Sequence, residues 1–220
     1  MRSGDARHEI LYAIRTNLAQ DTSPPILSSP SPEGTGGQGV RTPIPRDLVA
    51  RFREQLVAVG ALCTAVRGET EAAAALARIL TEGGARRVVG SDSAVVQRLL
   101  HAMGDGFELE RLDRLSRDEL FSCDAGVTTA QWGIAETGTL VLESAREQSR
   151  LLSLVPPIHV AVLSTRCICD SLGDALASVS PASHAVTFIT GPSRTSDIEL
   201  TLVVGVHGPQ TVHVLLMEEA

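Results

Sequence analysis

The chain has 220 residues, a formal net charge of −7 at pH 7 and a hydrophobic share of 43%, of which aromatic residues are only a small part at 3%. An acidic chain of this size can form one domain with an aliphatic core, and it has no general electrostatic attraction to nucleic acid or to an anionic membrane surface. All 19 basic residues are arginine, which excludes a Schiff-base lysine and a phosphate-loop lysine, so any bound anion must be held by arginine, hydroxyl groups or backbone N–H groups.

The composition changes along the chain and divides it into three segments. Residues 1–20 place aliphatic side chains at helical spacing and predict a short N-terminal amphipathic helix. Residues 21–45 are dense in Pro, Ser and Gly and predict a flexible linker or arm. Residues 46–220 carry the repeated apolar patterns of a folded domain.

The cysteines do not have the spacing of a metal site. They are Cys63, Cys123, Cys167 and Cys169. None forms a CxxC pair, and two cysteines that lie two residues apart on a helix point away from one another, so no metal or Fe–S site is expected from this chain alone. With no signal peptide and no apolar run long enough to span a membrane, the sequence predicts a cytoplasmic protein with reduced thiols.

Between residues 46 and 121, the apolar patterns alternate between helical and strand spacing. Helices are expected at residues 47–66, 69–84, 94–103 and 116–121. Short strands are expected at residues 85–93 and 106–112. Strands that alternate with helices of this length indicate a mostly parallel, doubly wound α/β sheet.

The second half of the chain is richer in strands. Two or three short strands joined by tight turns are expected over residues 124–144, where Thr, Val and Ile recur between glycines. Buried strands are expected at residues 156–164, 185–191 and 211–218. A crossover helix at residues 165–179 and a short helix at residues 195–204 would connect them, which makes the last third another βαβ unit.

The loop "TGPSRTSDIE", residues 190–199, concentrates hydrogen-bonding groups between two apolar strands. Ligands of open α/β sheets bind at the carboxyl ends of strands, where exposed N–H groups at a helix start attract anions and Arg194 would act as a clamp on carboxylate or phosphate. The same residues also suit a capped turn in which Arg194 pairs with a neighbouring carboxylate. The predicted ligand-binding residues are Gly191, Pro192, Ser193, Arg194, Thr195, Asp197 and Glu199, with Gly208 from a later loop.

A second candidate site is "IAETGTLVLES", in which Glu136 stands between an apolar strand end and a Thr-Gly-Thr turn. A carboxylate beside a glycine that permits close approach can act as a nucleophile or general base, and it can equally cap a turn or pair with arginine. The predicted ligand-binding residues of this turn are Thr137, Gly138 and Thr139.

Histidine and arginine side chains give further candidates. His207 lies between glycines just before a strand, a suitable place for an acid/base or hydrogen-bonding imidazole. His159 and His213 lie inside apolar strands and are expected to be core histidines with a backbone partner. Arg146 and Arg150 can reach the cleft expected between the loops of Glu136, Arg194 and His207, or they can form a solvated face.

Three stretches of the sequence resemble the lactate utilization protein C family, also called LutC/YkgG, which carries the LUD domain. They are "GVTTAQWGIAETGTLVL", "SRLLSLVPPIHVAVL" and "ITGPSRTSDIELTLVVGVHGPQTVHVLLME". The resemblance is close in the C-terminal half of the chain, weaker from Arg46 to Phe121, and absent from the linker.

This resemblance implies a fold of the NagB/RpiA/CoA-transferase-like group, which agrees with the parallel sheet expected from the patterns. It also implies a role in the oxidation of L-lactate to pyruvate, together with two partner proteins whose Fe–S centres supply the redox cofactors. No cofactor is then expected in this chain. Because the family has no agreed catalytic residues, the resemblance points to the motif positions as a site and does not assign a mechanism to them.

Three hypotheses follow, and the sequence does not decide whether the chain is an enzyme. The first is a non-redox subunit of a lactate-oxidising system that binds a small carboxylate or phosphate, with Arg194 on the anion and with Glu136 and His207 positioning it or exchanging a proton. The second is an acyl- or CoA-transferase with Glu136 as nucleophile, because "AETG" is similar to the short glutamate–glycine pattern of class I CoA-transferases. The third is a non-catalytic structural or regulatory partner.

Overall fold

The structure of the chain, a computed structural model, describes residues 46–147, 150–196, 202–204 and 208–218. The helix and the linker predicted at residues 1–20 and 21–45 lie outside the described residues. None of the described helices has the length and apolar character needed to cross a membrane.

The main sheet consists of parallel strands. They are β1 (Leu62–Arg67), β2 (Arg87–Gly90), β3 (Glu108–Arg111), β4 (Ala125–Thr129), β7 (Ile158–Ser164) and β12 (Thr211–Glu218). Their order across this six-stranded sheet is β1-β12-β7-β4-β2-β3, and every neighbouring pair is parallel. Parallel pairing requires a long connection between strands, and helices provide most of these connections.

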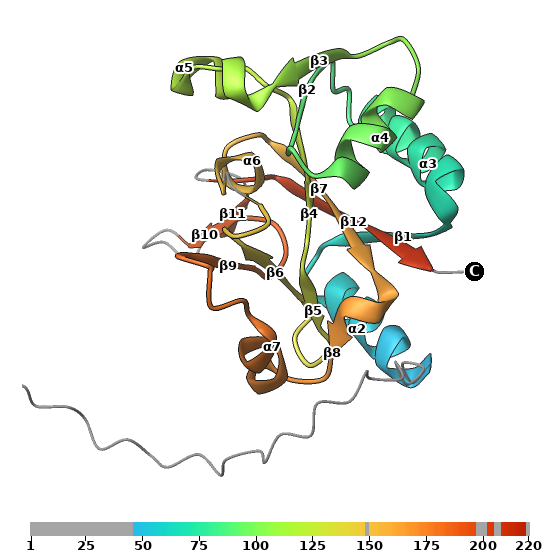
Figure 1. The fold of residues 1–220 in the computed structure, drawn as a ribbon, viewed down its shortest axis with the longest axis vertical. Coiled ribbons are helices and arrows are strands. Elements are labelled where there is room, and N and C mark those ends of the chain that lie inside the picture. The colour runs from blue at the N-terminus through green and yellow to red at the C-terminus, as the bar shows by residue number, and fades with distance from the viewer. Residues whose placement is uncertain (1–45, 148–149, 197–201, 205–207, 219–220) are drawn as a thin grey trace, which may run out of the picture. The chain divides into compact units, whose positions relative to one another are not determined.

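The helices lie on both sides of this sheet. They are α2 (Arg46–Ala58), α3 (Gly68–Glu82), α4 (Ala94–Ala102), α5 (Arg117–Leu120), α6 (Leu151–Leu154) and α7 (Leu172–Ser178), with short 3-10 turns η1 (Leu112–Arg114) and η2 (Thr165–Cys167). Figure 1 shows α3 and α4 together on one side of the main sheet. The prediction of a mostly parallel, doubly wound α/β sheet is therefore confirmed.

A second, smaller sheet packs against the other side. It contains β5 (Trp132–Ile134), β6 (Thr139–Glu143), β8 (Ile168–Cys169) and β9 (Val186–Ile189) in the order β8-β5-β6-β9. β6 is antiparallel to both β5 and β9, whereas β8 is parallel to β5. A separate antiparallel pair is formed by β10 (Arg194–Ser196) and β11 (Leu202–Val204).

The two faces of the main sheet bury separate hydrophobic clusters. On one face, Leu76 of α3 and Leu99 of α4 pack with Val160 of β7. On the other, Phe52 of α2 and Leu140 of β6 join residues of β7 and β12 in a second cluster. Complete burial of each such aliphatic side chain stabilises the fold by about 1.5–3 kcal/mol, so the second sheet and α2 are firmly held on this face.

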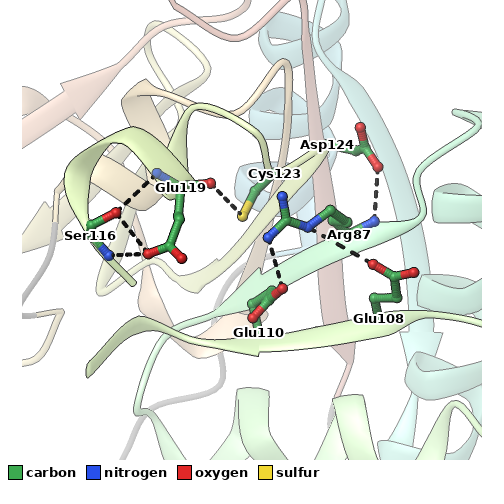
Figure 2. Close-up of polar contacts among 7 residues, drawn as sticks. All are labelled: Arg87, Glu108, Glu110, Ser116, Glu119, Cys123 and Asp124. Carbon is green, nitrogen blue, oxygen red and sulfur yellow. Dashed lines mark hydrogen bonds and ion pairs between the residues drawn. The ribbon is translucent and has the colours of Figure 1, made fainter. Parts of the chain in front are cut away.

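Polar contacts fix the β2–β3 edge of the main sheet, as Figure 2 shows. The Arg87 guanidinium donates to Glu110 of β3 at 2.9 Å and lies 3.9 Å from the carboxylate of Glu108. The Asp124 carboxylate accepts the backbone N–H groups of Arg86 and Arg87, both at 2.8 Å. These contacts join strands from three parts of the chain.

The helix predicted at residues 47–66 is wrong in its second half. α2 ends at Ala58, and residues 62–67 instead form β1, the edge strand that pairs with β12. Gly60 permits the break because its φ of 85° lies in the left-handed region that favours glycine. Pairing with a buried strand then outweighs the helical spacing of the residues that follow.

The helix predicted at residues 195–204 is also wrong. Arg194–Ser196 and Leu202–Val204 pair as antiparallel strands, with Arg194 opposite Val204. The β-branched residues Thr195 and Val203, which face each other in this register, favour extended pairing. The last third of the chain is therefore not a βαβ unit.

The predicted crossover helix at residues 165–179 is shorter than expected. It consists of η2, the short strand β8 and only then α7, which begins at a capping box formed by Ser171 and Asp174. β9 then pairs antiparallel with β6 in the second sheet, so α7 does not connect parallel neighbours. β9 is also less buried than predicted, since Phe188 is 43% exposed.

Candidate functional site

The structure brings the two predicted motifs together. β6 begins at Thr139 and pairs with β9, which ends just before Thr190. The hydroxyl oxygens of these two threonines lie 2.8 Å apart, and Thr137 continues the chain of hydroxyl groups at 2.7 Å from Thr139. The turn containing Glu136 and the loop containing Arg194 are thus parts of one cluster, which we call the threonine cluster (Thr137, Thr139 and Thr190).

Two glycines hold both motifs against the C-terminal end of α2. Gly138 and Gly191 have φ angles of 64° and 80°, and a Cβ at either position would overlap backbone atoms of α2 or of Val59, the residue that follows it. The Arg194 guanidinium donates to the Val59 carbonyl oxygen at 2.7 Å. A cation is favourable there, because the last carbonyl groups of a helix carry partial negative charge.

The remaining predicted residues lie nearby or lie outside the described residues. The Ser193 N–H donates to the Pro209 carbonyl oxygen at 2.9 Å, and Gly208 packs closely on the Ser193 side chain. Pro192 is half-buried, and Thr195 lies within β10. Residues whose placement falls outside the described ranges are Asp197, Glu199 and His207.

Glu136 lies at an exposed position of the β5–β6 turn. Its backbone N–H donates to the Asp170 carbonyl oxygen at 3.0 Å, which fixes the turn beside β8. The helix start on which the predicted anion cradle depended is not found among the described residues, because Arg194–Ser196 form a strand. A role for these residues in ligand binding stays a prediction.

A second polar cluster lies at the carboxyl ends of β2 and β4, the edge where parallel sheets bind ligands. Its centre is the buried side chain of Glu147, which is only 3% exposed. One carboxyl oxygen, Oε1, accepts the Thr129 N–H at 2.6 Å, the Thr129 hydroxyl, and the Ser91 hydroxyl at 3.1 Å. The other oxygen, Oε2, is buried without a hydrogen-bond partner among the described residues.

Burial raises the pKa of Glu147 above its ordinary value, and the Asp92 carboxylate adds to the increase. Hydrogen bonds from Thr129 and Ser91 oppose this effect without reversing it. A carboxyl group in such surroundings favours its neutral form, in which it can donate a hydrogen bond. Acid groups of this kind are typical of functional sites, although structural networks also produce them.

A small pocket adjoins Glu147. Its volume is about 150 Å³, and it is lined by Leu142, Ser144, Glu147, Arg150, Ala185 and Thr187. Its walls come from the end of β6, the start of β9 and the segment that leads into α6. Because Glu147 also bonds to the ends of β2 and β4, the pocket lies where the second sheet meets the carboxyl edge of the main sheet.

Glu143 is a second buried carboxylate, four residues before Glu147, and its surroundings are different. It accepts hydrogen bonds from Trp132 Nε1 at 2.9 Å, the Ser180 N–H at 2.8 Å and the Ser183 hydroxyl at 2.8 Å. Burial alone would raise the pKa of Glu143, but these hydrogen bonds outweigh it and the pKa lies below its ordinary value. Glu143 is therefore a charged structural anchor.

Of the two strand histidines, His159 lies in the core as predicted, whereas His213 is only half-buried, and the partner of each is a threonine side chain and not the backbone. His159 is fully buried and its Nε2 lies 2.9 Å from the Thr128 hydroxyl, while His213 Nε2 lies 2.8 Å from the Thr64 hydroxyl. Burial lowers the pKa of each histidine to about 4. Both are neutral at pH 7.

Glu147 and its partners are not among the site residues that the sequence predicts. Of the same stretch, "SAREQSR", only Arg146 and Arg150 are predicted as cleft or surface residues, because the stretch has no strand or glycine signal. One usable sign was present: "GSDS" follows the predicted strand at β2, and hydroxyl groups after a parallel strand indicate the ligand edge. Among the described residues, no group of three His, Cys, Asp or Glu side chains is placed to hold a metal ion.

The fold and these clusters define an α/β domain with polar side chains gathered at the carboxyl edge of its main sheet, and comparison with known proteins identifies its family. The family model of the LUD domain matches residues 49–217. The chain belongs to the LUD domain family.

Individual relatives agree with this assignment. The chain is 31% identical over 220 residues to the lactate utilization protein C of Deinococcus radiodurans, a match that covers 98% of this chain and 97% of the relative. A match to the lactate utilization protein C of Geobacillus thermodenitrificans is 28% identical and covers 74% of this chain and 75% of the relative. An uncharacterized protein of Neisseria meningitidis is 40% identical over a shorter stretch, 50% of this chain and 48% of the relative.

A solved structure has the same fold. The crystal structure of a DUF162 family protein from Deinococcus radiodurans matches with a TM-score of 0.60 and 26% sequence identity. The match covers 78% of this chain and 96% of that chain.

Proposed function

We propose that this chain serves lactate utilization as a component that binds a small carboxylate. The observation that carries the proposal is the similarity to a lactate utilization protein C along nearly the whole of both chains. Further support comes from the LUD domain match and from the polar groups gathered at the carboxyl edge of the main sheet.

In this proposal, partner proteins with Fe–S centres carry the electrons, and this chain contributes ligand binding or assembly. Arg194 stays a candidate for the ligand anion because its guanidinium has further N–H donors beyond the one on the Val59 carbonyl. Glu136, exposed and close to the threonine cluster, is the candidate that positions the ligand.

Growth on lactate tests the role. Deletion of the gene from its host should abolish growth on L-lactate as sole carbon source and leave growth on pyruvate intact, and the full-length gene should restore it. Unchanged growth on L-lactate after deletion would contradict the proposal. Reduced growth on pyruvate as well would point to a general defect.

Arg194 has a test that separates ligand binding from helix capping. Arg194→Ala loses both the bond to Val59 and any ligand contact, whereas Arg194→Lys keeps a positive charge at the helix end. If Arg194 holds the ligand, both variants should weaken L-lactate binding by about tenfold or more, the value of one charge-assisted hydrogen bond. Unchanged binding in both would restrict Arg194 to a structural role.

An acyl- or CoA-transferase remains the second candidate, because Glu136 is exposed beside the close backbone approach at Gly138. The Glu136 carboxylate would attack the thioester carbonyl of an acyl-CoA, which forms a mixed anhydride and releases the CoA thiolate. Hydroxylamine would then attack the Glu136 carbonyl of this anhydride and release the acyl group as a carboxylate. Mass spectrometry should then find a hydroxamate at Glu136. Its absence, with the protein intact, would exclude the transferase and leave carboxylate binding or a purely structural role.

A further inference from the structure

We infer that the pocket between β6 and β9, which Glu147 and Arg150 also line, binds a small 2-hydroxy or 2-oxo monocarboxylate, with Arg150 on the carboxylate group and Glu147 as a hydrogen-bond donor. This inference rests on the proposed function for the choice of lactate and pyruvate within that chemical class, and it places the ligand at Arg150 and Glu147 as the alternative to Arg194 and Glu136. The site itself rests on the pocket and on the groups that line it.

The size of the pocket matches such a ligand. A volume of about 150 Å³ is several times the roughly 10–15 Å³ that a single water molecule needs in a cavity, so a small organic acid can enter it. The ligand class is therefore a small molecule.

The lining has both the apolar and the polar character that the ligand needs. Leu142 and Ala185 offer an apolar wall for a methyl group. The Ser144 hydroxyl oxygen accepts the N–H groups of His184 and Ala185, each at 3.0 Å. Its own O–H hydrogen is therefore free to donate to a ligand, and the hydroxyl group of Thr187 adds a second donor or acceptor.

Arg150 is the cation of the pocket. Within the described part of the chain, no carboxylate lies at ion-pair distance from its guanidinium, in contrast to Arg51, Arg87 and Arg98, each of which pairs with Asp or Glu. A guanidinium can bind a carboxylate with two parallel hydrogen bonds. A pocket whose arginine has no ion-pair partner among the described residues is thus suited to an anionic ligand.

Glu147 is the acid of the pocket, and its position explains how a carboxylate can approach it. Its Oε1 already accepts donors from Thr129 and Ser91, so a proton on the carboxyl group belongs on Oε2, the oxygen without a described partner. A neutral carboxyl group donates to a ligand oxygen, whereas a charged one repels a carboxylate.

The charges around Glu147 come from several elements. Asp92, in the loop before α4, disfavours the ionised form of Glu147. Glu143 lies four residues earlier at the end of β6, and Arg146 and Arg150 lie on the same segment as Glu147. A bound carboxylate adds one more negative charge, so binding above the ordinary range of a glutamate should be accompanied by uptake of a proton on Glu147.

Titration calorimetry of the full chain tests the site. L-lactate, pyruvate and, for comparison, inorganic phosphate are titrated into the wild type, Arg150→Gln, Glu147→Gln and the control Arg146→Gln. Arg146 is exposed on the same segment and does not line the pocket. Arg150→Gln should weaken carboxylate binding by about 10- to 100-fold, as expected for loss of a charge-assisted pair, and Arg146→Gln should bind like the wild type.

Glu147→Gln separates the donor role from a structural role. The glutamine keeps an N–H donor and should keep most of the affinity. Titration in two buffers of different ionisation enthalpy, repeated between pH 5 and pH 8, should show proton uptake in the wild type on the alkaline side of the pKa of Glu147 and none at any of these pH values in Glu147→Gln. Equal proton uptake in both would overturn the role of Glu147.

The remaining outcomes also decide. Equal affinity in Arg150→Gln and Arg146→Gln would overturn the site, as would the absence of binding of either carboxylate to the wild type. If calorimetry shows no carboxylate binding in the pocket but gene deletion still abolishes growth on L-lactate, the pocket is refuted and the proposed role in lactate utilization is kept. If the pocket binds lactate but gene deletion does not affect growth on L-lactate, the binding site is confirmed and the proposed role in lactate utilization is refuted.

Discussion

Thr129 and Glu147 are joined twice through a single carboxyl oxygen, since both the N–H and the hydroxyl group of Thr129 donate to Glu147 Oε1. This contact connects the carboxyl end of β4 in the main sheet to the segment between β6 and α6. It also holds a buried acid at the edge where ligands of parallel sheets bind. The position of Glu147 is thus fixed by the backbone of the sheet, independently of any ligand.

The stability of the protein should depend on pH through Glu147. Burial raises its pKa in the folded state, so the folded chain binds more protons than the unfolded chain above the ordinary pKa of glutamate. The stabilisation is therefore present at low pH and is lost as pH rises through the folded pKa. As pH rises through this range, the free energy of unfolding of the wild type should fall relative to that of Glu147→Gln, by about 1.4 kcal/mol for each unit by which folding raises the pKa. Urea unfolding of both proteins at pH 5 and pH 8 measures this difference, and a difference that does not depend on pH would contradict it.

His159 should produce the opposite dependence. Burial lowers its pKa to about 4, so the unfolded chain binds more protons between about pH 4 and the ordinary value of 6.5. Stability that is present above pH 6.5 is lost as pH falls through this window, by at most about 3 kcal/mol. His159→Gln removes this titration, and the exposed His101→Gln is the control. Urea unfolding from pH 7 to pH 4.5 should show a smaller loss in His159→Gln than in the control or the wild type.

Much of the fold could be predicted from local pattern, and the errors have a common cause. The strands β4, β6, β7 and β12 are rich in apolar and β-branched residues, and their burial agrees with this intrinsic preference. The sequence predicts helix over most of β1 and over residues 195–204, which include part of β10 and all of β11, because the apolar spacing there fits a helix and only pairing with another strand makes these residues extended. Such pairing is not visible in a local window of sequence.

The candidate site divides in the same way. The two motifs that meet at the contact between Thr139 and Thr190 could be predicted as site loops from the sequence, because each has a turn glycine beside an apolar strand. The buried position of Glu147 could not be predicted from the sequence, because it depends on contacts with Thr129 and Ser91, which lie 18 and 56 residues away along the chain. Only the three-dimensional structure makes a charged residue in an irregular segment into a buried acid.

The close packing of the motif turn on α2 predicts a large cost for any side chain at Gly138. Its φ of 64° is strained for other residues, and a Cβ there would overlap the backbone of Gln55 and Leu56. Gly138→Ala should lower the free energy of unfolding by about 2–4 kcal/mol. Gly84 is the matched control, because its φ is 69° but no atom lies within 4 Å of the added Cβ. In urea unfolding, Gly84→Ala should cost about 1 kcal/mol; equal losses in both variants would refute the packing argument.

The surroundings of Glu143 predict a coupling between one buried carboxylate and the single tryptophan of the chain. Trp132 Nε1 donates to Glu143, and the hydrogen bonds on Glu143 hold its pKa below its ordinary value despite burial. Stability that Glu143 contributes is therefore present above the ordinary pKa of glutamate and is lost as pH falls through the folded value.

In Glu143→Gln, an NH₂ group replaces one of the two carboxylate oxygens that now accept hydrogen bonds from three donors, so at least one donor loses its acceptor. Leaving a buried donor unpaired costs about 1–3 kcal/mol, and this loss should appear in urea unfolding at pH 7, together with a change in the fluorescence of Trp132. The exposed Glu136→Gln is the control, which should alter neither. Because the wild-type carboxylate becomes neutral in acid, the fluorescence of the wild type at low pH should approach that of Glu143→Gln. A wild-type spectrum that stays constant down to the acid unfolding transition would show that Trp132 does not sense the charge on Glu143.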